Sequence, residues 1–111
     1  MGMDLDFGAA LATRAKGFPV VIGRMEQLPF RSGAVPAFFS SETLEHVPDL
    51  ADAASELARV LAPGGSLVLS VPANERFRSA WDEWAGHLRR FEPAGFAAAF
   101  APLRLERAVW F

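Results

Sequence analysis

The chain has 111 residues, of which 51% are hydrophobic and 22% charged, and it contains no cysteine. This size and composition fit one globular domain and exclude a disordered tail, a disulfide framework and a cysteine-based zinc site. Eleven basic and thirteen acidic residues give a net charge of −2, so a nucleic-acid partner is not expected. No apolar stretch reaches the length of a membrane span and no leader pattern opens the chain, which predicts a cytoplasmic protein.

The first part of the chain alternates short apolar runs with a helical pattern. Residues 1–6 could hold the end of a strand, and Asp6 is placed to cap a helix over 7–16. The β-branched run 20–22 predicts a buried strand, and the apolar run 37–40 predicts another. These elements alternate as in parallel strand–helix–strand units.

The second part continues the alternation. Asp49 is placed to cap an amphipathic helix whose apolar positions recur over 50–61 on a single face. The apolar run 67–71 predicts a strand that is buried and central in the sheet. Residues 93–100 read as a helix, and 103–107 alternate like a half-exposed strand. The whole pattern predicts an α/β fold with a doubly wound, mostly parallel sheet.

Doubly wound sheets bind ligands outside the carboxyl ends of their strands. Three such ends carry polar residues, namely Asp4, the stretch 23–26 and the stretch 40–42. An ionised aspartate offers two acceptor oxygens, so Asp4 is suited to hold both hydroxyls of a ribose. The alternative is a solvated acid, or a helix cap that competes with Asp6.

The two histidines of the chain, His46 and His87, lie far apart in the sequence. A site of histidine and acidic ligands is conceivable, but no ligand spacing supports it, so no metal ligand is assigned. His46 also reads simply as a polar loop residue beside Pro48. Ser40 and Ser41 lack the glycine-flanked turn of a hydrolase nucleophile, which disfavours serine hydrolysis.

Three motifs together resemble a known family. They are Leu-Pro-Phe at 28–30, Leu-Glu-His-Val at 44–47 and Arg-Val-Leu-Ala-Pro-Gly-Gly at 59–65. In this order and spacing they resemble the class I S-adenosylmethionine-dependent methyltransferases, in their type 11 branch, and the segment 86–91 resembles a Gly-His-x-Arg-Arg-aromatic motif of one bacterial subgroup. The resemblance implies a Rossmann-like fold, S-adenosyl-L-methionine as cofactor, and methyl transfer to a small metabolite or a lipid.

The resemblance also implies roles for individual residues. The acid that holds the cofactor ribose corresponds to Asp4, and the apolar residue beside the adenine corresponds to Leu5. Met25 and Glu26 correspond to the turn whose backbone lies against the adenine. Ser41 corresponds to the end of the next strand, near the methionine part of the cofactor and the methyl acceptor.

His46 corresponds to a position just beyond that strand, where a substrate contact or a catalytic base is expected.

Three features depart from the family. Its glycine-rich loop would lie about 20 residues before Asp4, so the first strand and that loop are missing from residues 1–111. Arg24 stands where the family has an acid that accepts from the adenine, and Val35-Pro36 replaces the usual Phe-Asp before the fourth strand. The last strand of the family is missing too. The expectation is a single truncated methyltransferase domain.

Two hypotheses about function therefore stand side by side. The first is a methyltransferase that is incomplete as given. The second is a non-catalytic remnant, or an interaction module of the same fold that a partner chain completes. Loss of a central strand leaves two unpaired sheet edges, through which self-association is expected.

Overall fold

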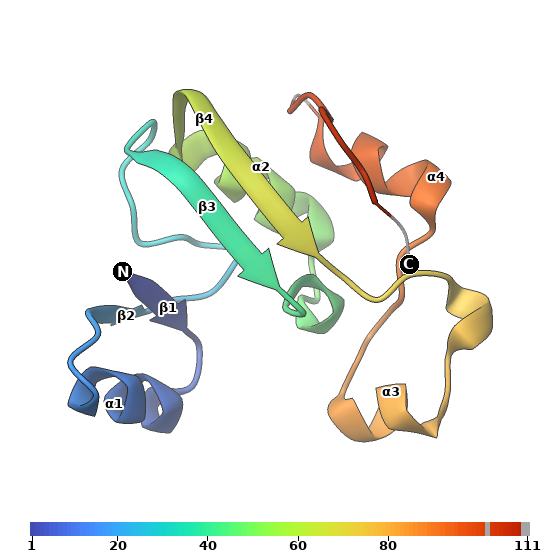
Figure 1. The fold of residues 1–111 in the computed structure, drawn as a ribbon, viewed down its shortest axis with the longest axis horizontal. Helices are drawn as coiled ribbons and strands as arrows, with labels where there is room; N and C mark the ends of the chain where they lie inside the picture. Colours follow the sequence, from blue (N-terminus) through green and yellow to red (C-terminus); the bar gives the residue numbers. More distant parts are fainter. Residues whose placement is uncertain (102, 110–111) are drawn as a thin grey trace.

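The computed structural model describes residues 1–101 and 103–109, which form a mixed α/β fold (Figure 1). Within them, strand β1 (Gly2–Asp4) pairs with β2 (Val20–Ile22), and β3 (Val35–Ser41) pairs with β4 (Leu61–Ser70). Both pairs are parallel, so the alternation of strands and helices does give parallel strand–helix–strand units. The sheet is partial, since the two pairs remain separate two-stranded sheets in the described residues.

The first unit runs through β1, helix α1 (Phe7–Ala15) and β2. The Asp6 side chain accepts a hydrogen bond of 2.7 Å from the Ala9 backbone N–H, as the sequence predicted for the helix start. The helix ends beside Gly17, whose φ of +86° is a conformation that glycine adopts at little cost.

The second unit runs through β3, helix α2 (Leu50–Val60) and β4. The predicted cap is again present, because the Asp49 side chain accepts from the Asp52 N–H at 2.9 Å. The apolar face of α2 buries Ala53, Ala54, Leu57 and Val60. It belongs to a core of ten buried residues among those described: Met25, Leu28, Leu44, Val47, Ala53, Ala54, Leu57, Val60, Phe91 and Phe100.

The predicted burial of two strands is wrong. Residues 67–70 do lie in β4, but this strand pairs only with β3 in the described residues, and Val68 is 57% exposed. Helix α2 and the core cover one face of this sheet, while Phe39 and Val68 point to the other face and stay open to solvent. Ile22, in the other predicted buried strand, is half exposed as well. Apolar residues on both faces of a strand indicate two covering layers, and the described residues supply only one.

A groove of about 820 Å³ separates β1 from β3. Gly2 and Met3 of β1 line one side, and the length of β3 lines the other. It lies where the resemblance places the missing first strand, between the ribose-binding strand and the strand that ends at Ser41. Pro36, which lacks an N–H, lines this groove beside the irregular register between Val35 and Ala37.

The rest of the described chain is made of short elements. They are η1 (Leu44–His46), η2 (Glu75–Phe77), α3 (Ala80–Ala85), α4 (Pro93–Phe96) and η3 (Ala97–Phe100). The predicted helix over 93–100 is therefore present as α4 followed by a 3₁₀ turn. The strand predicted over 103–107 is wrong, because these residues form no ladder and 104–107 are exposed. No helix in the described part of the chain is both long and apolar enough to span a bilayer.

Candidate functional site

Asp4 ends β1, at the carboxyl edge of the first sheet. Its Oδ1 accepts from the Asp6 N–H at 2.9 Å, and its carbonyl accepts from the Gly23 N–H at 3.1 Å. Asp6 is the residue that caps α1, so Asp4 is not the cap. The neighbouring Leu5 is 71% exposed. Asp4 and Leu5 thus lie at the strand end where a ligand of this fold class binds.

The turn after β2 combines a buried and a charged side chain. Met25 is 5% exposed and belongs to the core, while Arg24 Nε lies 3.4 Å from Glu26 Oε2. Gly23 precedes them, and a Cβ at this position would come within 2.9 Å of the Met3 sulfur and of Pro29. The chain passes closely here, which requires glycine. Arg24 is held by Glu26.

Ser41 ends β3, and its hydroxyl lies 3.0 Å from the hydroxyl of Ser70. Ser70 donates to a carboxylate oxygen of Glu42 at 2.8 Å, and Glu42 has a φ of +49°. Of the predicted site residues, Ser41 and Met25 line the groove between β1 and β3, whereas Asp4, Leu5, Glu26 and His46 are not among its lining residues. The structure therefore divides the predicted cofactor residues between the groove and the adjoining strand ends.

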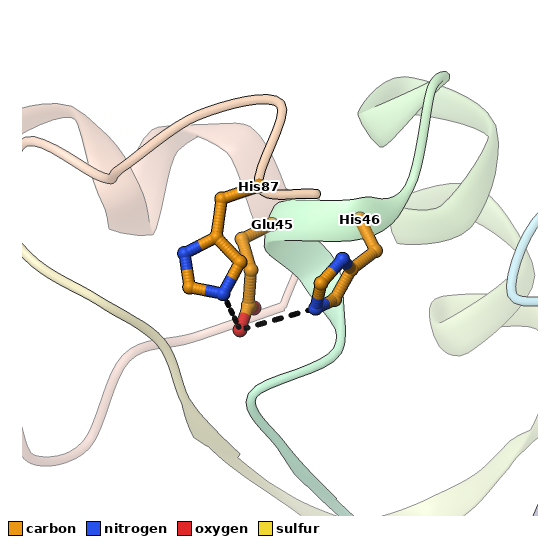
Figure 2. A group of neighbouring side chains, drawn as sticks. All are labelled: Glu45, His46 and His87. Atoms are coloured by element: carbon orange, nitrogen blue, oxygen red, sulfur yellow. Dashed lines mark ion pairs between the residues drawn. The ribbon is translucent and has the colours of Figure 1, made fainter. Parts of the chain in front are cut away.

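A second group of side chains lies just beyond Ser41 (Figure 2). Glu45, in η1, is fully buried, and among the described residues neither of its carboxylate oxygens has a hydrogen-bond partner. Its Oε1 lies 3.9 Å from His46 Nε2 and 3.8 Å from His87 Nε2. The fold thus brings together the two histidines that are distant in the sequence.

Each of these imidazole rings is oriented through its other nitrogen. His46 Nδ1 lies 3.2 Å from the Gly86 carbonyl oxygen, and His87 Nδ1 lies 2.9 Å from Asp82 Oδ1. A carbonyl and a carboxylate only accept hydrogen bonds, so Nδ1 carries the proton in both rings. Both Nε2 atoms consequently face Glu45.

Asp82, in α3, is the buried anchor of this region. It accepts from Arg90 Nε at 2.8 Å, from Arg90 Nη2 at 3.1 Å and from the Ser79 N–H at 2.8 Å. Arg90 first, then His87 and Ser79, hold the pKa of Asp82 far below its usual value. Gly86, with a φ of +75°, ends α3 and turns the chain so that His87 and Arg90 both reach Asp82. This geometry explains the Gly-His-x-Arg-Arg segment.

Burial is the main influence on the pKa of Glu45. Desolvation raises the pKa of its carboxyl group and the nearby Glu42 adds to the rise, while the backbone N–H of Glu45 itself, His46 and His87 oppose it. Sequence reasoning assigned no role to Glu45 or Asp82. The Leu-Glu-His-Val motif contained Glu45, but its partners come from a segment about 40 residues away and could not be paired with it.

Two of the family-like motifs meet in a different network. Arg59 donates to the carbonyl oxygens of Phe30 at 2.9 Å and Leu28 at 3.0 Å, and its Nη2 lies 2.7 Å from Glu56 Oε2. The same carboxylate accepts from the Leu28 N–H at 2.8 Å. The side-chain hydrogen bond from Arg59 is the main cause that lowers the pKa of Glu56. This network fixes the Leu-Pro-Phe loop on α2.

Residues 1–69 match the sequence profile of a methyltransferase domain family, and residues 38–110 match a second profile of the same description. The chain therefore belongs to the class I S-adenosylmethionine-dependent methyltransferases. The match extends over more than half of the chain. It includes the strand ends after β1, β2 and β3, and the cluster around Glu45.

Curated relatives agree with this assignment. A demethylmenaquinone methyltransferase from Mycolicibacterium vanbaalenii is 36% identical over 84 residues, which cover 73% of this chain and 37% of that protein. The corresponding enzyme of Mycolicibacterium gilvum is 34% identical over the same length. The chain thus spans a little over a third of the length of these relatives. They favour the methyltransferase over the non-catalytic alternative.

Solved structures share the fold. A chain in a complex containing the Haloferax volcanii Trm112 methyltransferase activator superposes with a TM-score of 0.79 and 24% identity, covering 89% of this chain and 47% of that one. An S-adenosylmethionine-dependent methyltransferase from Thermotoga maritima superposes with a TM-score of 0.77 and 22% identity, covering 90% of this chain and 52% of that one. At these identities the likeness supports the Rossmann-like fold, as the sequence predicted.

Proposed function

We propose that this chain carries part of the active site of a methyltransferase that transfers a methyl group from S-adenosyl-L-methionine to a small, lipid-like acceptor. The proposal rests on the position of Asp4, which ends a parallel strand at the edge where this fold class binds ligands. The acceptor class is inferred from the relatives named demethylmenaquinone methyltransferase. The proposal includes the cytoplasmic location expected from the sequence.

The residues at the strand ends suit the cofactor in part. One carboxylate oxygen of Asp4 accepts from the Asp6 N–H, and the other, which makes no hydrogen bond within the described part of the chain, is available for a ribose hydroxyl. Leu5 offers an exposed apolar side chain for the adenine. Arg24 has no acceptor for the adenine amino group and pairs with Glu26, so this contact of the family is absent.

The bound cofactor would supply a methyl group activated by a positively charged sulfur. The protein must hold the acceptor in line with that group, so positioning dominates the chemistry. We assign Met25, Glu26 and Ser41 to the cofactor side. His46 is assigned to the acceptor, because its side chain is 43% exposed and its Nδ1 faces the Gly86 carbonyl.

An NMR titration of the chain with S-adenosylmethionine tests the cofactor assignment, since it also detects weak binding. Shifts are expected at the amides of Asp4, Leu5 and Glu26. Asp4→Ala should weaken binding about 10- to 150-fold, the equivalent of roughly 1.5–3 kcal/mol for a hydrogen bond to a charged group. Asp52→Ala is the control, since it removes an exposed aspartate of α2. Equal affinity of the two variants would refute the ribose role of Asp4.

Methyl transfer itself is tested with a reduced quinone as acceptor and mass spectrometry of the product. Gain of one methyl group is the expected result, and His46→Ala should slow it more than it weakens cofactor binding. Association of chains through the edges of β1 and β3 belongs to the same proposal, because both edges face the groove without a strand partner there. Sedimentation at increasing concentration measures it.

A further inference from the structure

The arrangement of Glu45, His46 and His87 is electrostatically unbalanced. Asp82 and the Gly86 carbonyl hold a proton on Nδ1 of each ring, so a neutral imidazole presents only a lone pair at Nε2. Both lone pairs then face a fully buried carboxylate oxygen to which no group in residues 1–101 and 103–109 donates a hydrogen bond. Three acceptors that converge in this way repel one another unless a cation lies between them.

Protons alone do not satisfy this geometry. A protonated ring would donate from Nε2 to Glu45 Oε1, yet the two distances are 3.9 and 3.8 Å. Hydrogen bonds between nitrogen and oxygen are about 2.7–3.2 Å long, so neither pair is hydrogen-bonded. A protonated Glu45 that donated to a ring nitrogen would face the same separation.

The spacing does suit a metal ion. One atom from each of the three side chains lies within 4.8 Å of the others. Ligand atoms at about 2.0–2.2 Å from a tetrahedral ion lie roughly 3.3–3.6 Å apart, so the three side chains would have to move closer together than they lie here to close the site. Figure 2 shows both imidazole rings pointing their Nε2 atoms at the same carboxylate oxygen.

We propose that Glu45, His46 and His87 bind one divalent first-row transition-metal ion, with Zn²⁺ or Fe²⁺ favoured over Mg²⁺ or Ca²⁺. Two imidazoles and one carboxylate form a ligand set typical of transition metals, whereas Mg²⁺ and Ca²⁺ prefer oxygen ligands alone. This site goes beyond the proposed methyl transfer and does not depend on it.

Surrounding groups support the ligands as in known metal sites. Ligating histidines donate their second N–H to a carboxylate or a backbone carbonyl, which fixes the ring and its tautomer. His87 does so to Asp82, which is itself held by Arg90, and His46 does so to Gly86. The orientation of both rings is therefore fixed before any ion binds.

The site is exposed to solvent at His46. Glu45 is fully buried and the His87 side chain is 10% exposed, but that of His46 is 43% exposed. Three protein ligands and an accessible side leave coordination positions for water or an oxygen atom of a small ligand.

Titration of the metal-free chain with Co²⁺ and with Zn²⁺ tests the proposal. Co²⁺ reports its coordination through visible absorption, and calorimetry gives the stoichiometry for Zn²⁺. We expect one ion per chain, a rise in the unfolding temperature on binding, and no displacement by an equal concentration of Mg²⁺. The chain contains no cysteine and no other histidine, so the background comes from carboxylates alone.

Variants locate the site. His46→Ala removes the most exposed ligand and is the variant least able to disturb the fold, and Glu45→Gln removes the buried charge. Each should weaken binding at least 100-fold, more than the 10- to 100-fold typical of groups that only support a ligand. Glu83→Gln, an exposed glutamate of α3, removes the same charge and should bind like the parent. One-to-one binding that survives His46→Ala and His87→Ala, or no binding by the folded parent, would overturn the proposal.

Discussion

The molecule contains two strand–helix–strand units that differ in what they bury. The unit β1–α1–β2 has Ala10 as the buried residue of its helix, while Phe7 and Leu11 of α1 are 63% and 50% exposed. The unit β3–α2–β4 buries four residues of its helix, and Leu57 and Val60 are fully inaccessible. The same local architecture therefore occurs once with a core and once almost without one.

This difference separates local from tertiary determinants of the fold. Both helices begin with an aspartate whose side chain accepts from the backbone of its first turn, Asp6 in one unit and Asp49 in the other. Caps and apolar spacing thus form the element in either setting. Stability comes from the layer that packs on the element, and α2 has such a layer in β3, β4, Phe91 and Phe100.

Core truncation should show the largest contrast between the units. Leu57→Ala removes a fully buried side chain of α2, and we expect the free energy of unfolding to fall by about 2–5 kcal/mol. Leu11→Ala is the same change in α1 at a half-exposed position, where the effect should stay within about 0.5 kcal/mol. Urea unfolding of both variants measures the difference. Equal losses would mean that α1 is as well packed as α2.

Arginine removal should show a smaller contrast. Arg59→Ala deletes the bonds to the Phe30 and Leu28 carbonyls and leaves Glu56 without its cation. A loss of about 2 kcal/mol is expected, as for hydrogen bonds to charged groups in a partly buried setting. Arg14→Ala in α1 is the matched control, because this exposed side chain makes no ion pair in the described residues. Thermal unfolding of the two variants tests the role assigned to the motif.

The parts of the fold that sequence reasoning predicted are those decided by nearby residues. The caps at Asp6 and Asp49, the strand over 37–40 and the helical segment from 93 each depend on local patterns. The burial of 67–71 failed because it depends on what covers the second face of the sheet, which no local pattern contains. The strand over 103–107 failed for a related reason, since alternation does not provide a neighbouring edge to pair with.

For the site too, the features decided by nearby residues were predicted and those decided by tertiary contacts were not. The places of Asp4 and Ser41 at strand ends followed from the order of elements, and the structure confirms those places while their roles remain proposals. Glu45 was missed because its significance lies in its contact with His87, about 40 residues further along the chain, and Asp82 because its burial and its contacts with His87 and Arg90 depend on how the chain folds after α3. The burial of an acidic residue can be predicted from a sequence only when its contact partners are known.

Lowering the pH should have the smallest effect on stability, and this effect should again arise in the unit β3–α2–β4. The pKa of Glu56 is lower in the folded chain than its ordinary value of 4.5, with the Arg59 hydrogen bond as the main cause. A lowered pKa means that the ionised carboxylate stabilises the fold above about pH 4.5, and that this contribution is lost as the pH falls through the folded value. Protonation then weakens the attachment of the Leu28 loop to α2.

Glu56→Gln should therefore cost about 1 kcal/mol at neutral pH, because a neutral acceptor replaces a charged one opposite Arg59. The gap from the parent should shrink as the pH falls below 4.5, since the parent then loses the same charge. The pKa of Asp82 is lowered further, so its contribution to the free energy of unfolding is lost at a lower pH than that of Glu56. The effects of the two carboxylates therefore fall in different pH ranges. Urea unfolding over a series of pH values measures the gap, with Glu83→Gln as the variant that should track the parent throughout. A gap that stays constant from neutral pH to acid would show that the charge of Glu56 does not hold the loop, and that the two carbonyl bonds of Arg59 are sufficient.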